Sequence, residues 1–224
     1  MTSRLHRLLL FLLLAAAGPL RADPDAQAIL KTARLAHTGQ DQTFTGHLRV
    51  QATGRIVPFT LALSGSTFRY QFADGAIILR LTDNGAQLME AAHGDTRKIS
   101  PARFDKPVEG TDITYEDISL QFLFWTKAKI DGSELVDGLN CWKLNIEPGG
   151  QPSAYGAVLL WVSKRTGDFL AGEGYDHAGN LVKRFKVISG QQNSQGGWML
   201  KKMRIETLGG GKDSITYLEI DKGN

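Results

Sequence analysis

The alternation of apolar and polar residues, with a period of two, constrains the fold of this chain more than any other feature of its sequence. In FTGHLRV, Phe44 and Leu48 fall on one face of an extended segment, and in VPFTLAL, Phe59 and Leu61 do the same. Such alternation is typical of strands that bury one face. Turn signals separate the segments, among them ADG, DNG, RTGD and HAGN. About eleven strands at this short spacing predict a mainly β fold, in which one antiparallel sheet wraps into an incomplete barrel.

Residues 23–39, DPDAQAILKTARLAHTG, predict a helix instead of a strand. Apolar residues such as Leu30 recur there at helical spacing. Asp23 or Asp25 can cap the beginning of this helix, and Gly39 is placed to stop it.

A second departure from the alternation covers residues 112–126. The side chains from Ile118 to Trp125, including Phe122, leave almost no polar face. A helix that is apolar on nearly all sides must be covered on nearly all sides, and a curved sheet would provide that cover. We therefore expect a helical lid whose residues Ile118, Phe122 and Trp125 face a cavity.

Three acids lie at the beginning of this segment, in GTDITYEDI, and they could bind a metal, form an acid–base pair or begin a helix. Thr114 and Asp117 have the spacing of a capping box. The segment has no histidine and lacks the regular oxygen-ligand spacing of a calcium loop. We interpret Asp112, Thr114 and Asp117 as the cap of the lid helix, and we expect no metal site.

No sequence signature supports an enzyme. The histidines after the first residues are scattered, with no pair at metal-ligand spacing. There is no Gly-x-Ser-x-Gly elbow, and GGGKDS lies between two predicted strands, where a hairpin turn explains it. Cys141 is the only cysteine, so it cannot form a disulfide within the chain. We interpret it as a small packed side chain. We therefore assign no catalytic residue and no cofactor.

Residues 1–22 have the layout of a cleaved export signal. Arg4 and Arg7 precede an unbroken apolar run at residues 8–17, and the small Ala22 follows. We expect the mature chain, residues 23–224, to be exported, soluble and folded as a single domain.

Removing this segment also removes the net charge. The whole chain carries a formal charge of +3, but residues 1–22 hold three arginines and no acid, which leaves 23 basic and 23 acidic residues. Nucleic-acid binding needs a net basic surface, so we exclude nucleic acid as a partner.

Apolar side chains are more abundant in the strands than a sheet with one buried face requires. They form either an ordinary hydrophobic core or the wall of a ligand cavity, and periodicity alone does not separate the two. If a cavity is present, we expect its wall to include Phe44, Leu48, Phe59, Leu61, Phe68, Tyr70, Leu79 and Trp161.

Several stretches together resemble the LolA-like family, in its branch of outer-membrane lipoprotein-sorting proteins. They are FTGHLRV, STFRYQFADG, LTDNGAQL, GTDITYEDI and GYDHAGNLVKRFKV, in this order along the chain. The most specific are GTDITYEDI and the pattern Y-D-x-x-G-x-L-x-K from Tyr175 to Lys183. The resemblance implies an α+β fold: an incomplete antiparallel β-barrel with helices on its concave face. It also implies a hydrophobic cavity that takes up lipoprotein acyl chains or other lipids.

One position departs from the family pattern. The well-studied carriers have a basic residue just before the strand that corresponds to STFRY, whereas this chain has Leu63, Ser64 and Gly65 there. A lipid other than a lipoprotein therefore stays open as the cargo.

The resemblance implies a monomeric periplasmic carrier, with a membrane transporter or an acceptor lipoprotein as a further partner. The alternative is a lipid-sensing regulator of envelope stress that binds a protein partner. An enzyme is the least favoured interpretation.

Overall fold

The computed structural model describes most of the chain after residue 23. The residues that it describes are 24–36, 38–192, 198–209, 211 and 213–221. The predicted export signal, residues 1–22, lies outside this part of the chain. No helix among the described residues is long and apolar enough to cross a membrane.

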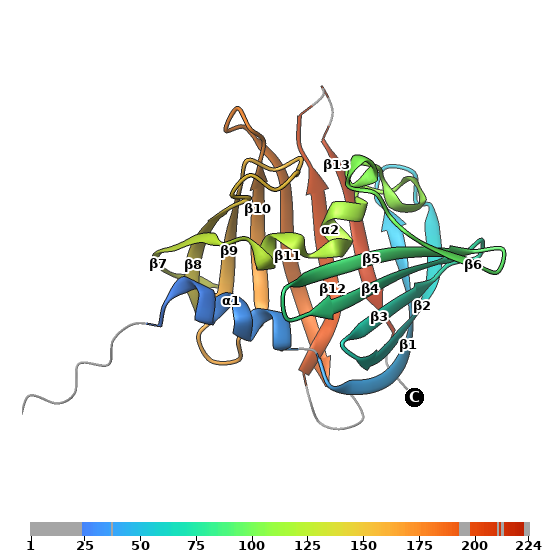
Figure 1. Ribbon diagram of the computed structural model, residues 1–224, viewed down its shortest axis with the longest axis horizontal. Coiled ribbons are helices and arrows are strands. Elements are labelled where there is room, and N and C mark those ends of the chain that lie inside the picture. The colour runs from blue at the N-terminus through green and yellow to red at the C-terminus, as the bar shows by residue number, and fades with distance from the viewer. Residues whose placement is uncertain (1–23, 37, 193–197, 210, 212, 222–224) are drawn as a thin grey trace, which may run out of the picture.

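Thirteen strands within the described residues form one antiparallel sheet (Figure 1). Their bounds are β1 (Gln40–Val50), β2 (Ile56–Gly65), β3 (Thr67–Gln71), β4 (Ala76–Thr82), β5 (Gly85–Ala92), β6 (Asp95–Lys98), β7 (Lys127–Val136), β8 (Leu139–Glu147), β9 (Ala157–Ser163), β10 (Phe169–Tyr175), β11 (Leu181–Gln192), β12 (Trp198–Thr207) and β13 (Ser214–Ile220). The chain runs outward from β1 to the edge strand β6 and crosses to the other edge at β7. It then returns strand by strand to β13, which pairs with β1.

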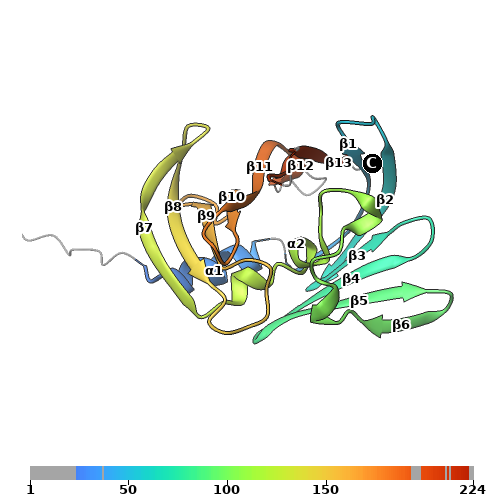
Figure 2. The same ribbon diagram turned by 90° about the horizontal axis from the view of Figure 1, so that it is seen from above.

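The sheet curves strongly without closing. Seen from above, one wing of the sheet carries β2 to β6, the other carries β7 to β10, and α2 lies between them (Figure 2). The strands β6 and β7 are the two ends of the strand order and are not paired with each other. The predicted mainly β, antiparallel and incompletely closed architecture is therefore confirmed.

The sheet has more strands than the predicted eleven, and β6 shows why. All four of its residues, Asp95 to Lys98, are polar and exposed. The strand is held by its backbone pairing with β5 at the edge of the sheet. A strand without a buried face carries no apolar alternation, so the sequence pattern could not reveal it.

The predicted first helix is present as α1 (Ala26–Leu35). The Asp25 carboxylate accepts a hydrogen bond from the Ala28 N–H at 2.9 Å and so caps its first turn. The helix ends at Leu35, before the expected stop at Gly39. Leu30 is fully buried and belongs to the same apolar cluster as side chains of β8 and β9.

The crossing segment between β6 and β7 contains four short helices rather than one long helix. These are η1 (Pro101–Arg103), η2 (Val108–Gly110), α2 (Tyr115–Ser119) and η3 (Gln121–Phe124). The prediction of a single helix over residues 112–126 was wrong because Leu120 adopts a left-handed conformation, with φ of 51°, and ends α2. The Ser119 hydroxyl donates to the Glu116 carbonyl and accepts from the Gln121 N–H. These local side-chain bonds compete with helix continuation.

Two hydrophobic clusters form the core. The first lies among β1 to β5, β12, β13 and residues 99–118, and the second among α1, η3 and β7 to β9. Leu120 and Phe124 pack against both clusters. The crossing segment therefore connects two cores that the curved sheet holds apart.

Candidate functional site

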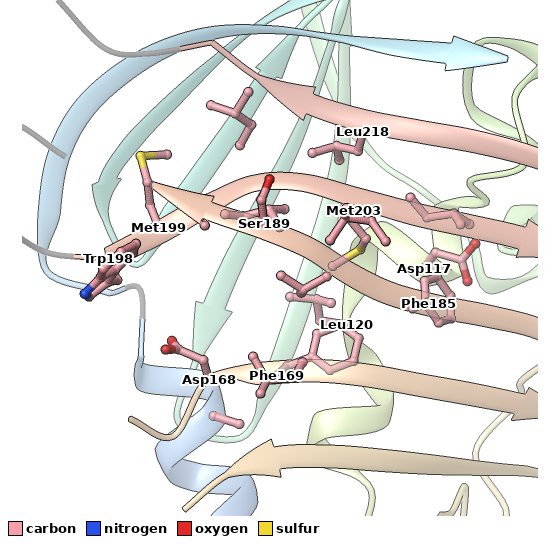
Figure 3. A pocket seen from close by; sticks show the side chains of 18 of the residues that line it. Asp117, Leu120, Asp168, Phe169, Phe185, Ser189, Trp198, Met199, Met203 and Leu218 are labelled. Atoms are coloured by element: carbon pink, nitrogen blue, oxygen red, sulfur yellow. The ribbon is translucent and has the colours of Figure 1, made fainter. Parts of the chain in front are cut away.

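A cavity of about 530 Å³ lies between the two cores. Apolar side chains from both wings of the sheet and from the crossing segment make up most of its lining (Figure 3). The central strands contribute Phe185, Val187, Met199, Met203, Ile205, Leu218 and Ile220; β2 to β4 contribute Leu61, Leu63, Phe68, Tyr70 and Leu79; the crossing segment contributes Ile113, Ile118, Leu120, Phe122 and Leu123. Its volume falls within the range of pockets that bind small molecules.

The cavity opens at one end of the strands. Its exposed lining residues come from the β7–β8 turn, the β9–β10 turn, the end of β11 and the beginning of β12. We call this end, formed by Asp137, Arg165, Thr166, Ile188 and Trp198, the mouth. The side chains of Trp198 and Ile188 remain well exposed there, at 58% and 47%. Figure 3 shows Trp198 and Asp168 at this end, and Asp117 and Phe185 at the other.

The opposite end is closed by α2, where Asp117 is held by three groups. The Tyr155 hydroxyl donates to Asp117 Oδ1 at 2.6 Å, and the Thr114 N–H donates to Oδ2 at 2.8 Å. Lys183 Nζ lies 3.4 Å from Oδ2, and both charged side chains are almost fully buried, at 6% and 3% exposure. Burial, together with the Asp117 charge, raises the pKa of Tyr155 well above its usual range.

Two further acids attach the same segment to other parts of the sheet. The buried Glu116 carboxylate accepts hydrogen bonds from the Ser153 hydroxyl and, at 2.9 Å, from the Ala154 N–H. Burial raises the pKa of Glu116 despite these bonds. The Asp112 carboxylate accepts from the hydroxyls of Ser214 and Thr216 on β13.

We call these side chains the α2 anchor: Asp112, Glu116, Asp117, Tyr155, Lys183 and Thr216. Thr114 and Asp117 form a reciprocal capping box. Asp112 lies outside that cap and holds the segment to β13 instead. In the part of the chain that the structure describes, no three His, Cys, Asp or Glu side chains are grouped so as to hold a metal ion. The carboxylates of GTDITYEDI thus each bind protein groups.

The residues expected in the cavity wall separate into three groups. Leu61, Phe68, Tyr70 and Leu79 line the cavity. Phe44, Leu48 and Phe59 are buried in the first core and do not line it. Trp161 lies on the other face of β9, where its indole N–H donates to Glu134.

The expected lid residues also divide into some that line the cavity and one that does not. Ile118 and Phe122 line the cavity, whereas Trp125 is packed in the second core at 1% exposure. Sequence reasoning missed the lining from β11 to β13, including Val187, Met203 and Leu218. The alternation in LVKRFKVI and SITYLEI contains the signal for Val187 and Leu218.

Tyr70 places a polar group within the apolar wall. Its ring packs edge-on against Phe59, with 5.9 Å between the ring centroids. Burial raises the pKa of Tyr70 to about 12. Among the described residues the Tyr70 hydroxyl has no hydrogen-bond partner, in contrast to the hydroxyl of Tyr155. Buried tyrosine hydroxyls usually find a hydrogen-bond partner. The Tyr70 hydroxyl is therefore available to bond with a polar group that enters the cavity.

Three solved structures share this fold. A putative outer membrane lipoprotein-sorting protein domain from Vibrio parahaemolyticus has a TM-score of 0.70 at 18% identity, covering 88% of this chain and 92% of that one. A DUF1329 family protein from Desulfovibrio piger has 0.66 at 20%, covering 89% and 93%. A LolA superfamily protein from Nitrosomonas europaea has 0.65 at 16%, covering 89% and 92%. None of these three descriptions names an enzymatic activity.

At these identities the likeness establishes the fold. No curated protein matches the sequence. A family model described as "Uncharacterized protein" matches residues 83–222, which is more than half of the chain. The chain therefore belongs to that family, and its fold is the LolA-like fold that its sequence resembles.

Proposed function

We propose that the protein is a periplasmic carrier that binds acyl chains of lipids or lipoproteins in the cavity between its two cores. The observation that carries this proposal is the cavity itself, about 530 Å³ in volume and lined mainly by apolar side chains. In this proposal residues 1–22 direct export, and residues 23–224 form the mature carrier.

The free energy associated with such a space supports the proposal. If a void of this size were dry, it would cost roughly 13 kcal/mol at about 24 cal/mol per Å³. That cost is comparable to the whole stability of a typical domain. Each methylene group that enters instead gains about 0.8 kcal/mol from leaving water. A chain that keeps this space unfilled by its own side chains is therefore suited to an apolar guest.

The closed end also suits an apolar guest. Asp117 is the only acid near that end of the lining, and its carboxylate is already bound by Thr114, Tyr155 and Lys183 within the described residues. An acyl chain that approaches it would strip no water from an unpaired charge.

We place cargo entry at the mouth rather than at a moving α2. The α2 anchor ties the crossing segment to β9, β11 and β13 or the loops beside them, so displacing α2 would break several buried polar contacts. The mouth presents the exposed side chains of Trp198 and Ile188 beside the opening. A donor membrane or a membrane protein would deliver cargo at this end, and an acceptor membrane would receive it there.

A matched pair of substitutions tests the carrier proposal. Leu218 lines the cavity, whereas Leu135 is 69% exposed and does not line it. Delipidated protein is titrated with an 18-carbon fatty acid, and the bound fraction is measured by native mass spectrometry. We expect binding by the unmodified protein and by Leu135→Trp, and at least a tenfold loss in Leu218→Trp. Absence of binding by the unmodified protein, or equal binding by both variants, would overturn the proposal.

A further inference from the structure

We infer that Tyr70 is a specificity-determining residue, and that the preferred cargo is a long aliphatic molecule with an acceptor oxygen partway along its chain. The oxygen belongs to a hydroxyl, a ketone or an ester, and it accepts a hydrogen bond from the Tyr70 hydroxyl. This inference rests on the proposed function and narrows its cargo from acyl chains in general to those with an internal oxygen.

Tyr70 lies inside the cavity, away from the mouth. The neighbouring strands β12, β13, β1, β2 and β3 are antiparallel in turn, so β3 begins at the same end of the sheet as β12. Trp198, at the beginning of β12, belongs to the mouth. Phe68 is the second residue of β3, and Tyr70 lies two residues, or about 7 Å, further in. Both side chains line the cavity, so a guest that enters at the mouth passes Phe68 before it reaches Tyr70.

The Tyr70 hydroxyl is open to the cavity. In the described part of the chain, the enclosed polar side-chain atoms without a hydrogen-bond partner belong to Gln42 and Asn145, and neither residue lines the cavity. The Tyr70 oxygen also lacks a partner among these residues, but it is not enclosed. The edge-on contact with Phe59 limits the motion of the ring. The hydroxyl therefore presents a surface at a fixed place that a bound molecule can touch.

This hydroxyl acts as a hydrogen-bond donor. Burial raises the pKa of Tyr70 to about 12, so the group keeps its proton at neutral pH. Its neighbours in the wall are apolar: Leu61 lies opposite it on β2, and Phe68 precedes it on the same face of β3. A guest with an oxygen at this depth supplies the acceptor that these side chains do not.

The cost of leaving the hydroxyl unpaired makes it selective. A plain hydrocarbon chain that covers Tyr70 removes the hydroxyl from water and offers no hydrogen bond in return. A buried donor without a partner costs more than a formed hydrogen bond gains. Sites that hydrogen-bond an oxygen of their substrate reject the analogue that lacks it for this reason. The cavity therefore favours a chain with an internal oxygen over a plain chain of the same length.

The other polar side chains of the lining are not removed from water in this way. Ser189 supplies a second hydroxyl, but its neighbours Ile188 and Gly190 are exposed, so water stays within its reach. Asp117, at the closed end, is already bound on both oxygens. The charged and polar residues of the two turns at the mouth are Asp137, Arg165, Thr166 and Asp168.

Competition between chains of the same length tests the inference. Delipidated protein receives equimolar pairs, each of 18-carbon stearic acid with one derivative that carries a hydroxyl at carbon 2, 7, 10 or 12. Native mass spectrometry measures the ratio of the two complexes. We expect the best internal position to outcompete stearic acid by at least about fivefold. The hydroxyl at carbon 2 should give no advantage, because it stays beside the carboxylate, which remains in water at the mouth.

Two further pairs identify the source of the oxygen. A ketone at the best position should keep the advantage over stearic acid, because Tyr70 is the donor. Nonyl nonanoate, an ester with 18 carbons, competes against octadecanol, which has no internal oxygen. The acid and ester arms show which of the two sources the cavity prefers.

Substitutions assign the preference to Tyr70. Tyr70→Phe is expected to reverse the order, so that stearic acid outcompetes the internal hydroxy acid, because the hydroxyl of the guest is then the unpaired group. Tyr217→Phe makes the same change outside the cavity, where the hydroxyl bonds with Gln51, and should leave the ratio unchanged. Ser189→Ala removes the second hydroxyl of the lining and should also leave it unchanged. The unmodified protein alone decides whether the preference exists, so the test stands if a variant folds poorly.

Four results would overturn the inference while leaving the carrier proposal intact. Stearic acid could equal or outcompete every chain with an internal oxygen, or the ketone could lose the advantage of the hydroxyl. The advantage could also persist in Tyr70→Phe, or disappear in Ser189→Ala. Failure of every chain to bind would overturn the carrier proposal as well.

Discussion

The Lys183 ammonium lies 3.4 Å from the Asp117 carboxylate, and both side chains are almost completely removed from water. This ion pair joins GTDITYEDI to the end of the stretch from Tyr175 to Lys183, the two parts of the sequence that most specifically resemble the LolA-like family. Lys183 Nζ also donates to the Asp112 carbonyl and, at 3.0 Å, to the Thr207 hydroxyl. The two stretches thus meet at the closed end of the cavity.

Removal of Lys183 is expected to destabilise the protein strongly. In Lys183→Met the Asp117 carboxylate stays buried without its cation, which typically costs about 3–5 kcal/mol. Lys186→Met is the matched control, because Lys186 forms an exposed pair with Asp137. Such surface pairs contribute about 1 kcal/mol or less. Urea unfolding of both variants measures the difference, and equal losses would contradict a structural role for the buried pair.

The same substitution at two tyrosines is expected to give different results. Tyr155→Phe removes the 2.6 Å hydrogen bond to Asp117 and should lower the free energy of unfolding by about 1–3 kcal/mol. Tyr70→Phe removes a hydroxyl without a partner among the described residues, so it should leave stability unchanged to within about 0.5 kcal/mol.

Tyr70→Phe should instead affect the cargo. A saturated chain that covers the Tyr70 hydroxyl removes water from it without replacing the lost hydrogen bond, so the phenylalanine variant should bind an 18-carbon fatty acid more tightly, by up to about tenfold. Isothermal titration calorimetry measures this change. Weaker binding would show that the carboxylate of the fatty acid bonds with the Tyr70 hydroxyl, and an apolar tail covering this position would then be the wrong arrangement.

Buried Glu116 is expected to make stability depend on pH. Burial raises its pKa above the ordinary value of 4.5, so the folded protein binds this proton more readily than the unfolded chain. The stabilisation is fully present below the unfolded pKa and is lost as the pH rises through the folded pKa. Relative to Glu116→Gln, the unmodified protein should therefore gain stability as the pH falls from 7 toward 4.5.

Glu90 provides the control of opposite sign. Its hydrogen bond with Arg103 lowers its pKa, so its contribution is present above the unfolded pKa and is lost as the pH falls through the folded value. Unfolding by urea at several pH values, with Glu116→Gln and Glu90→Gln side by side, should give slopes of opposite sign. Slopes of the same sign would contradict the assignment for Glu116.

The strands were predictable where one face is buried and the other is not. Phe44 and Leu61 fall on one face in their own segments, and the register places them opposite each other. Trp161 was expected in the wall although the residues from Ala157 to Val162, AVLLWV, are all apolar, so alternation could not indicate a face. The register pairs Trp161 with Lys143 on the outer face, while Leu160 and Val162 are buried. A shift of one residue exchanges the two faces of a strand.

The polar part of the site was only partly predictable from the sequence. The local spacing of Thr114 and Asp117 indicates a capping box, which depends on neighbours within one turn. The contacts of Asp117 with Tyr155 and Lys183 come from distant strands and loops, and no local pattern in a single sequence encodes them. At Leu120 a long-range contribution joins the local bonds of Ser119, because the Leu120 side chain packs against both cores where the backbone turns left-handed.

The cation at the mouth leads to the last prediction. If the Arg165 guanidinium pairs with the anionic end of the cargo, Arg165→Gln should weaken binding of an 18-carbon fatty acid by about fivefold, since an exposed pair contributes about 1 kcal/mol. The neighbouring Lys164 is the matched control, because its ammonium lies 3.6 Å from the centre of the Trp142 ring and is already engaged. Lys164→Gln should leave the affinity unchanged.

The cargo itself supplies a second control for Arg165. An 18-carbon fatty alcohol has the same tail and no charge, so Arg165→Gln should not alter its binding. Raising the salt concentration should weaken fatty acid binding to the unmodified protein and leave the alcohol unaffected, because an exposed ion pair is screened by salt. Calorimetric titration of the acid and the alcohol into the unmodified protein and into Arg165→Gln measures the four affinities. An equal loss for the acid and the alcohol would show that Arg165 shapes the opening and does not recognise charge.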